Sequence, residues 1–236
     1  MYQGASQPLP PPEDVIVSQA SGAFPELASL RDKVAAGEHV IYVSMGTVVG
    51  TEPWTKPLVG DFYKRVFDAF AGRSRTTVVV SVGKVIKLAE LPPPPANYLV
   101  FNHVPQPALL RIASLFITHN GMNSTNEAIF AGIPMVCMPC FGDQNFNAER
   151  VADLGLGVHI ASPFAPGPAQ NLDHLSTQAM QDAAGAIFAQ YSAFKEKSDA
   201  MRAEFLVQNE YLHSSAIADI AAWVEQQKQK EPKRTS

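Results

Sequence analysis

Apolar residues along the chain gather in short runs that alternate with longer segments of helical spacing. Runs rich in β-branched and aromatic residues predict strands, and the chain carries six of them: 39–44, 76–82, 98–101, 115–118, 135–138 and 157–160. The run TTVVVSV at 76–82 is apolar at most positions, which is typical of a central strand of a parallel sheet, buried on both faces.

Segments with helical features separate and follow these runs. In 54–70, Leu58, Phe62, Val66 and Phe70 recur four residues apart, the spacing of one helix face. Further helices are predicted at 107–113, 123–131, 143–154, 175–191, 193–207 and 215–229. This alternation predicts an α/β fold: a doubly wound, Rossmann-like parallel sheet of about six strands with a helical C-terminus.

The two ends of the chain differ in composition from its middle. Residues 1–14 are small, polar and rich in proline. Such segments pack poorly and favour extended conformations, so we interpret them as a linker or arm. Residues 231–236 form a charged tail that is expected to fray. The folded domain is therefore expected to cover 15–230.

Composition narrows the class of protein. The 236 residues are 46% hydrophobic and 17% charged, as in a globular domain. The formal charge of -4 argues against nucleic acid as a partner. No apolar run is long enough to span a bilayer, and no signal-peptide pattern opens the chain. We expect a cytoplasmic protein without a membrane span.

The ends of two predicted strands carry residues suited to binding phosphate. In a doubly wound sheet, ligands bind beyond the carboxyl ends of the strands, where helix N-termini present free N–H groups. After the strand 115–118, His119 could donate to a phosphate and Gly121 would allow a close backbone approach. Asn123 and Ser124 could cap the next helix or reach a ligand oxygen. The turn 44–47, after the first strand, is a weaker candidate for the same phosphates.

Each candidate residue also has a purely structural interpretation. Ser124 and Glu127 are three residues apart and could form a capping box. A histidine such as His119 is more often buried and satisfied than ligand-binding. Asp143 and Gln144 could simply begin a helix, where an acidic residue suits the helix dipole. The chain also has a Cys-x-x-Cys spacing at Cys137 and Cys140, but no second pair accompanies it, so we expect no zinc or redox site and a core-packing role for one of them.

Taken together, four segments form a recognisable pattern: His-Val-Pro-Gln at 103–106, the stretch 116–128, Gly-Ile-Pro-Met-Val at 132–136, and 143–150 with Asp-Gln and Asn-Ala-Glu-Arg. In this order they resemble the donor-binding signature of the UDP-dependent glycosyltransferases of family 1, a GT-B family. The His-x-Gly-Met-x-Ser and Asn-Ala-Glu-Arg elements look closest to the bacterial macrolide-type enzymes. Weaker similarity covers most of the chain.

The resemblance implies a role for each matching residue. His119 and the helix start at Asn123 and Ser124 would hold the diphosphate, with Gly121 letting the backbone close in. Glu127 would accept the ribose hydroxyls rather than serve a capping box. The family's first-strand loop, which lies near the phosphates, corresponds here to Ser44, Gly46 and Thr47.

The same resemblance implies which residues contact the rest of the donor. Gln106 would contact the ribose region, and the backbone of Val104 would pair with the uracil edge. Asp143 and Gln144 would bind hydroxyls of the transferred sugar, and this pair commonly accompanies glucose. The family usually places Trp where this chain has His103. Imidazole stacks less well on uracil, so a thymidine nucleotide stays possible.

Family members have two similar domains, and this chain resembles only the C-terminal, donor-binding one. Their general base, a histidine oriented by an aspartate, lies in the N-terminal domain, so we expect no catalytic residue in this chain and no activity from it alone. The resemblance implies the donor half of an inverting transferase that binds UDP or UDP-glucose, needs no metal or cofactor, and acts with an N-terminal acceptor domain or subunit on a small apolar acceptor.

Two other functions stay open at this stage. One is a non-catalytic, regulatory subunit that binds a nucleotide sugar, because an intact donor motif without a base fits that function too. The other is half of a nucleotide-sugar 2-epimerase, which shares the two-domain architecture. The pair Asp143 and Gln144 argues against the epimerase.

Overall fold

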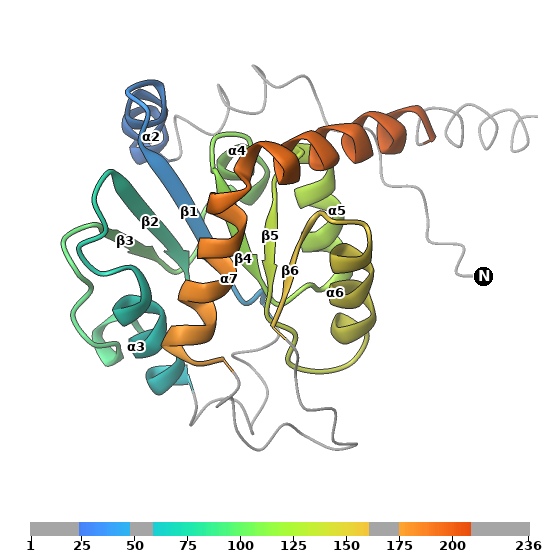
Figure 1. Ribbon diagram of the computed structural model, residues 1–236. Helices are drawn as coiled ribbons and strands as arrows, with labels where there is room; N and C mark the ends of the chain where they lie inside the picture. Colours follow the sequence, from blue (N-terminus) through green and yellow to red (C-terminus); the bar gives the residue numbers. More distant parts are fainter. Residues whose placement is uncertain (1–23, 48–58, 161–174, 209–236) are drawn as a thin grey trace, which may run out of the picture.

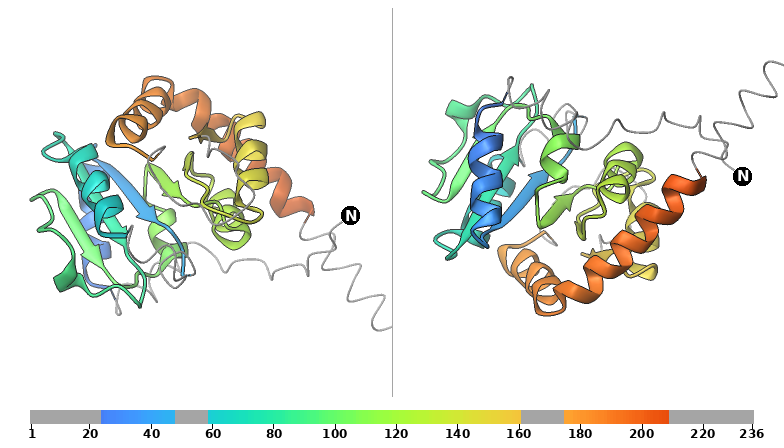
Figure 2. Two further views of the ribbon diagram at one scale, coloured as in Figure 1. Left: turned by 90° about the horizontal axis from the view of Figure 1, so that it is seen from below. Right: turned by 90° about the horizontal axis from the view of Figure 1, so that it is seen from above.

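The computed structural model describes residues 24–47, 59–160 and 175–208, which form a parallel sheet covered by helices on both faces (Figures 1 and 2). The strands are β1 (His39–Ser44), β2 (Thr76–Ser81), β3 (Tyr98–Phe101), β4 (Leu115–Thr118), β5 (Met135–Cys137) and β6 (Gly157–His159). The helices are α2 (Glu26–Ala35), α3 (Val59–Phe70), α4 (Gln106–Leu110), α5 (Met122–Ala131), α6 (Gln144–Asp153) and α7 (Thr177–Ala189), with a short 3-10 turn η2 (Leu88–Glu90). A further helix runs over 191–208.

The strand order places a crevice at the middle of the sheet. The order is β3-β2-β1-β4-β5-β6, and every neighbouring pair is parallel. The chain therefore winds outward from β1 in one direction and from β4 in the other. The connections after β1 and β4 leave toward opposite sides of this junction, which is where α/β sheets bind ligands. The predicted doubly wound, Rossmann-like fold is confirmed.

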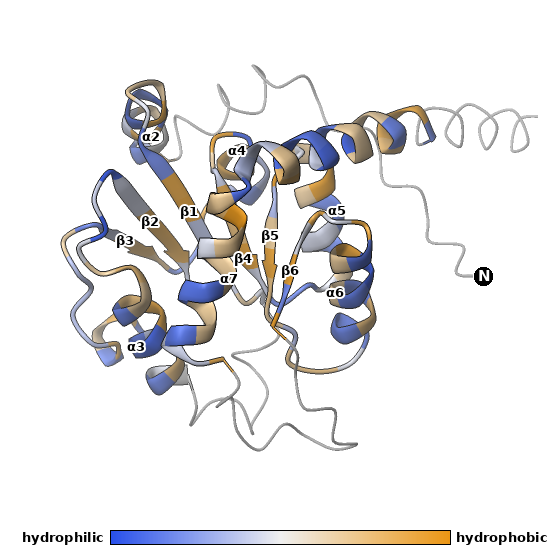
Figure 3. Ribbon diagram, in the orientation of Figure 1, coloured by the Kyte–Doolittle hydropathy of each residue, from blue (hydrophilic) through white to orange (hydrophobic). Residues whose placement is uncertain are grey.

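Two apolar cores hold the layers together. Successive residues of β1 point to opposite faces: Ile41 and Val43 pack with α3 and α7, whereas Val40 and Tyr42 pack with α2, α4, α5 and α6. Every residue of β2 is buried, which explains its almost continuous apolar run. In Figure 3 the strands are largely hydrophobic, while the outward sides of the helices are hydrophilic.

The predicted elements match the structure closely, with differences at their ends. The second, fifth and sixth strands each end one residue earlier than predicted. The helix predicted at 107–113 is the shorter α4, which begins at Gln106 after Pro105. Helix α2 was not predicted, although Leu30 and Val34, four residues apart, pack on the α4 side of the sheet.

Several predictions fall outside the described residues. These are the linker 1–14, the first part of the helix at 54–70, the helix at 215–229 and the tail 231–236, so the domain boundaries stay a prediction. Among residues 24–47, 59–160 and 175–208, no helix is long and apolar enough to cross a membrane.

Candidate functional site

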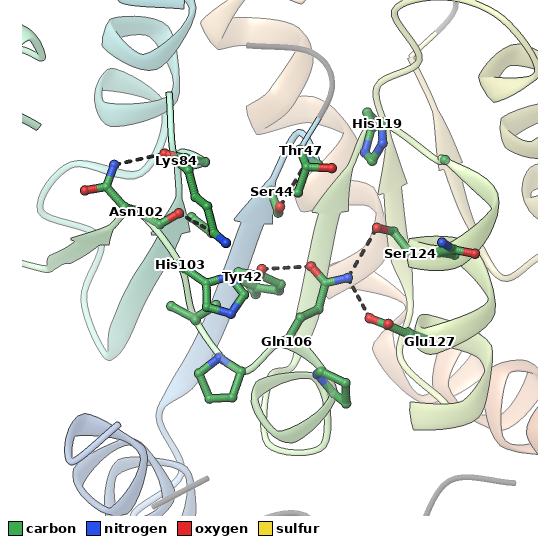
Figure 4. Close-up of a pocket in the computed structure, with 18 of the residues that line it drawn as sticks. Tyr42, Ser44, Thr47, Lys84, Asn102, His103, Gln106, His119, Ser124 and Glu127 are labelled. Carbon is green, nitrogen blue, oxygen red and sulfur yellow. Dashed lines mark hydrogen bonds between the residues drawn. The ribbon is translucent and has the colours of Figure 1, made fainter. Parts of the chain in front are cut away.

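A cavity of about 520 Å³ lies beyond the carboxyl ends of β3, β2, β1 and β4, the place that the strand order predicts (Figure 4). Its walls are the turns that follow these strands and the first turns of α4 and α5. Eleven of the thirteen residues predicted to bind the donor line it: Ser44, Gly46, Thr47, His103, Val104, Gln106, His119, Gly121, Asn123, Ser124 and Glu127.

A row of hydrogen bonds crosses the floor of the cavity from β1 to α5. The buried hydroxyl of Tyr42 donates to Gln106 Oε1 at 2.8 Å. Gln106 Nε2 in turn donates to Ser124 Oγ at 3.2 Å and to Glu127 Oε2 at 2.7 Å (Figure 4). Because an ionised Glu127 carboxylate can only accept, the Gln106 amide nitrogen faces it and Oε1 is left to accept from Tyr42. The row holds the Glu127 carboxyl on the cavity wall.

The alternative of a capping box at Ser124 and Glu127 is not realised. Helix α5 begins at Met122 with Gly121, which has no side chain, as its N-cap. Ser124 therefore lies inside the helix, and both side chains bind Gln106. Partial burial raises the pKa of Glu127, and the Gln106 hydrogen bond lowers it in part. The N–H groups in the first turn of a helix have no partner within the helix, so an uncapped helix start at a cavity is suited to binding an anion.

The imidazole of His119 is wedged between the two glycine turns. A Cβ atom on Gly46 would lie 2.5 Å from its ring, and one on Gly121 would lie 2.6 Å from its Nε2. Gly46 also has a left-handed φ of 72°, which favours glycine. Gly121 has φ -59°, which any residue adopts. Gly121 therefore makes room for the histidine, which the sequence argument about close backbone approach did not foresee.

Burial keeps His119 neutral. Desolvation lowers its pKa to about 4, although the charge of Asp143 and the backbone of Ser44 act in the opposite direction. His119 is only 8% exposed, and its Nδ1 has no hydrogen-bond partner among the described residues. The interpretation of a buried, satisfied histidine is therefore only half right. The residue lines the cavity, whereas the unpaired Nδ1 atom itself is buried.

The structure does not bring Asp143 and Gln144 to the cavity wall. Gln144 is buried, and its Oε1 accepts from two backbone N–H groups of the preceding loop at 2.8 and 3.1 Å. Asp143 Oδ2 accepts from Asn147 Nδ2 at 3.2 Å, and that amide also donates to the Asn120 carbonyl at 2.9 Å. The start of α6 is thus fastened to the turn that carries His119.

Three prominent cavity residues escaped the sequence analysis: Tyr42, Lys84 and Asn102. Lys84 and Asn102 follow the ends of β2 and β3, so applying the carboxyl-end rule to every strand would have found them. Tyr42 lies inside β1, stacked on Phe116 with ring centroids 4.9 Å apart, and its sequence position indicates only core packing.

Both cysteines of the Cys-x-x-Cys spacing are buried free thiols. Cys137 packs on one face of the sheet and Cys140 on the other. Burial raises the pKa of each thiol to about 12, so neither is a thiolate at neutral pH. Within the described ranges, no three His, Cys, Asp or Glu residues gather as a metal site would require.

Comparison with known proteins identifies the family. Residues 18–164 match the family described as UDP-glucoronosyl and UDP-glucosyl transferase. The chain belongs to this family. The resemblance inferred from the donor-binding segments is thereby confirmed at the level of the family.

Individual proteins similar to this chain are also glycosyltransferases. The NDP-glycosyltransferase YjiC of Bacillus subtilis (strain 168) is 41% identical over 121 residues, which are 51% of this chain and 29% of the relative. The oleandomycin glycosyltransferase of Streptomyces antibioticus is 33% identical over 131 residues, 56% of this chain and 29% of the relative. The crystal structure of CalG4, the calicheamicin glycosyltransferase, superposes with a TM-score of 0.63 at 26% identity, covering 80% of this chain and 42% of CalG4. The matched part of this chain spans less than half the length of each relative, as a C-terminal half would.

The lowered pKa of His119 predicts a pH-dependent stability. The unfolded histidine binds a proton near pH 6.5, and the folded one only near pH 4. The contribution of His119 to the free energy of unfolding is therefore complete above pH 6.5. It declines as the pH falls toward 4, by at most about 1.4 kcal/mol per pH unit. We expect the stability difference between the parent and His119→Gln to shrink over this range in urea unfolding. Since the other histidines are common to both proteins, parallel pH curves would contradict the prediction.

The contact between Gly121 and His119 predicts a coupled pair. Gly121→Ala should lower the free energy of unfolding by about 1–3 kcal/mol, because the new methyl group overpacks the imidazole. In a His119→Ala background the same substitution should cost less, about 0.5–1 kcal/mol, which is the residual preference for glycine over alanine at an N-cap. Thermal and urea unfolding of the four proteins measure this coupling. An equal cost in both backgrounds would show that the ring does not decide the residue at 121.

Proposed function

We propose that this chain is the donor-binding half of an inverting glycosyltransferase, with UDP-glucose as the leading donor and a small apolar molecule as the acceptor. Membership of the UDP-glucoronosyl and UDP-glucosyl transferase family supports nucleotide-sugar chemistry. One structural observation carries the proposal. The cavity combines a helix start without a side-chain cap, a histidine on its wall and a carboxyl held by an amide, which suit a diphosphate and a ribose side by side.

The diphosphate would lie at the start of α5. Backbone N–H groups and the positive end of the helix dipole favour the anion there, and His119 adds a ring N–H from the β4 turn. A bound diphosphate would raise the pKa of this histidine from its low value, because a negative charge favours the protonated ring. The neutral ring found without ligand is therefore compatible with a phosphate contact.

The nucleoside would extend from α5 toward β3. Glu127 would accept hydrogen bonds from the ribose hydroxyls, with Gln106 holding the carboxyl in place. The base would then reach the loop after β3, where His103 is exposed and Val104 is buried beneath it. The sugar would point toward the start of α6 and Asp143.

In the proposed reaction an acceptor oxygen attacks the anomeric carbon while the bond to the diphosphate oxygen breaks. The acceptor proton passes to a general base supplied by an N-terminal half or a partner subunit. The leaving diphosphate is stabilised by donors already in place at α5 and His119, without a required metal ion. The donor half alone would support slow donor hydrolysis at most.

Binding of UDP to this chain, without a partner, is the first test. A hydrogen bond to a charged group is worth roughly 1.5–3 kcal/mol, so His119→Ala should weaken UDP binding about tenfold or more. Uridine, which lacks the phosphates, should bind the variant and the parent alike. Calorimetry with UDP and competition with uridine measure the affinities of both proteins for the two ligands. Unchanged UDP affinity in a folded variant would remove His119 from the phosphate site.

The base subsite is tested by restoring the family's usual residue. Stacking on a base is worth about 1–3 kcal/mol, and indole offers more surface than imidazole, so His103→Trp should tighten UDP binding severalfold. Leu88→Trp, an exposed position outside the cavity wall, is the matched control. If His103→Trp binds UDP no better than the control, the base is held elsewhere.

A further inference from the structure

One cation on the cavity wall has no part in the scheme above. Lys84 follows Gly83, whose left-handed φ of 85° turns the chain after β2. Its side chain extends toward the part of the cavity that carries Asn102 and His103, whereas His119 lies on the other side (Figure 4). The strand order requires this separation, because β2 neighbours β3, and β1 stands between β2 and β4.

The loop that carries Lys84 is anchored at both flanks. Asn102 Nδ2 donates to the carbonyl of Gly83 at 2.9 Å and to that of Ile86 at 2.6 Å. Gly83 itself lies close to the Gly46 turn, since a Cβ on it would be 3.7 Å from the Gly46 carbonyl oxygen. Asn102 also immediately precedes His103. One side chain therefore ties the Lys84 loop to the loop after β3.

Lys84 itself has no ion-pair or hydrogen-bond partner within the described ranges. Lys87, three residues further along, differs in this respect because it pairs with Glu90 at 3.3 Å. The Lys84 ammonium thus stands on an anchored loop at a cavity, where a ligand acceptor would complete its hydrogen bonding.

We propose that Lys84 recognises the nucleobase, by donating a hydrogen bond from its ammonium to a carbonyl oxygen of the pyrimidine. This inference rests on the proposed function. With the diphosphate at α5 and the ribose at Glu127, the base is the part of the nucleotide that reaches the β2–β3 side. Uracil and thymine both carry two carbonyl acceptors. The ammonium contact compensates for the smaller stacking surface that His103 offers in place of an indole.

The test compares ligands that share the base and differ in phosphate. Lys84→Met keeps most of the stem and removes the charge. We expect it to weaken the binding of uridine, UMP and UDP by a similar factor, about tenfold or more, measured by NMR titration of each ligand. Lys87→Met is the matched control and should bind all three as the parent does.

The outcomes separate the possibilities. A loss confined to UDP would place Lys84 on the diphosphate, and no loss with any ligand would make it a solvated surface cation; either result overturns the proposal. Failure of the proposed function would show itself differently, as a parent chain that does not bind UDP.

Asn102 would act as a positioning residue for this contact. Asn102→Ala should weaken UDP binding in the parent and cause little further loss in the Lys84→Met background, because the contact it positions is already gone. Additive losses in this double-mutant cycle would show that Asn102 supports the fold without directing Lys84.

Discussion

The imidazole of His119 occupies space that two side chains would otherwise fill, and the centre of the site depends on that packing. The ring lies where the β1 and β4 turns meet, so Gly46 and Gly121 must both lack a Cβ. These turns belong to the two strands between which the sheet changes winding direction. The histidine therefore restricts both turns at the crevice to glycine.

The row of hydrogen bonds beside His119 begins at a residue of the apolar core. Tyr42 is almost fully buried, stacked on Phe116, and its hydroxyl reaches Gln106. Desolvation raises the pKa of this phenol far above the physiological range, so it stays a hydrogen-bond donor. Gln106 Oε1 accepts from this hydroxyl, while its amide nitrogen donates to Ser124 and to the Glu127 carboxyl. A core residue thus takes part in the row of hydrogen bonds at the cavity surface.

The cavity has two sides with different character. On the α5 side are an uncapped helix start, a histidine and a carboxyl held by an amide. On the β2–β3 side are Lys84, Asn102 and His103. This division would match the two ends of a nucleoside diphosphate, the ligand that we propose. Under the proposed function, a second half would supply the acceptor and the base.

Most of the fold followed from the sequence, because a parallel strand buried on both faces must be apolar and β-branched, and each crossover helix must be amphipathic. Helix α2 is an exception. It is about as amphipathic as the predicted helix α5, and contacts such as those of Leu30 and Val34 with the α4 side of the sheet support it. That support depends on where the sheet lies and is not visible in the local pattern.

The sequence also determined which turns carry the candidate chemistry, since strand ends, glycines and polar residues are local features. Only the tertiary structure decided how those residues are used. Ser124 and Glu127 have the spacing of a capping box, but Gln106, distant in sequence, binds both. Gly121 is required by a neighbouring ring rather than by its own backbone angles. Lys84 joins the cavity because β2 lies beside β3. Spacing along one segment cannot encode these relations, because each depends on a side chain brought from another strand or helix.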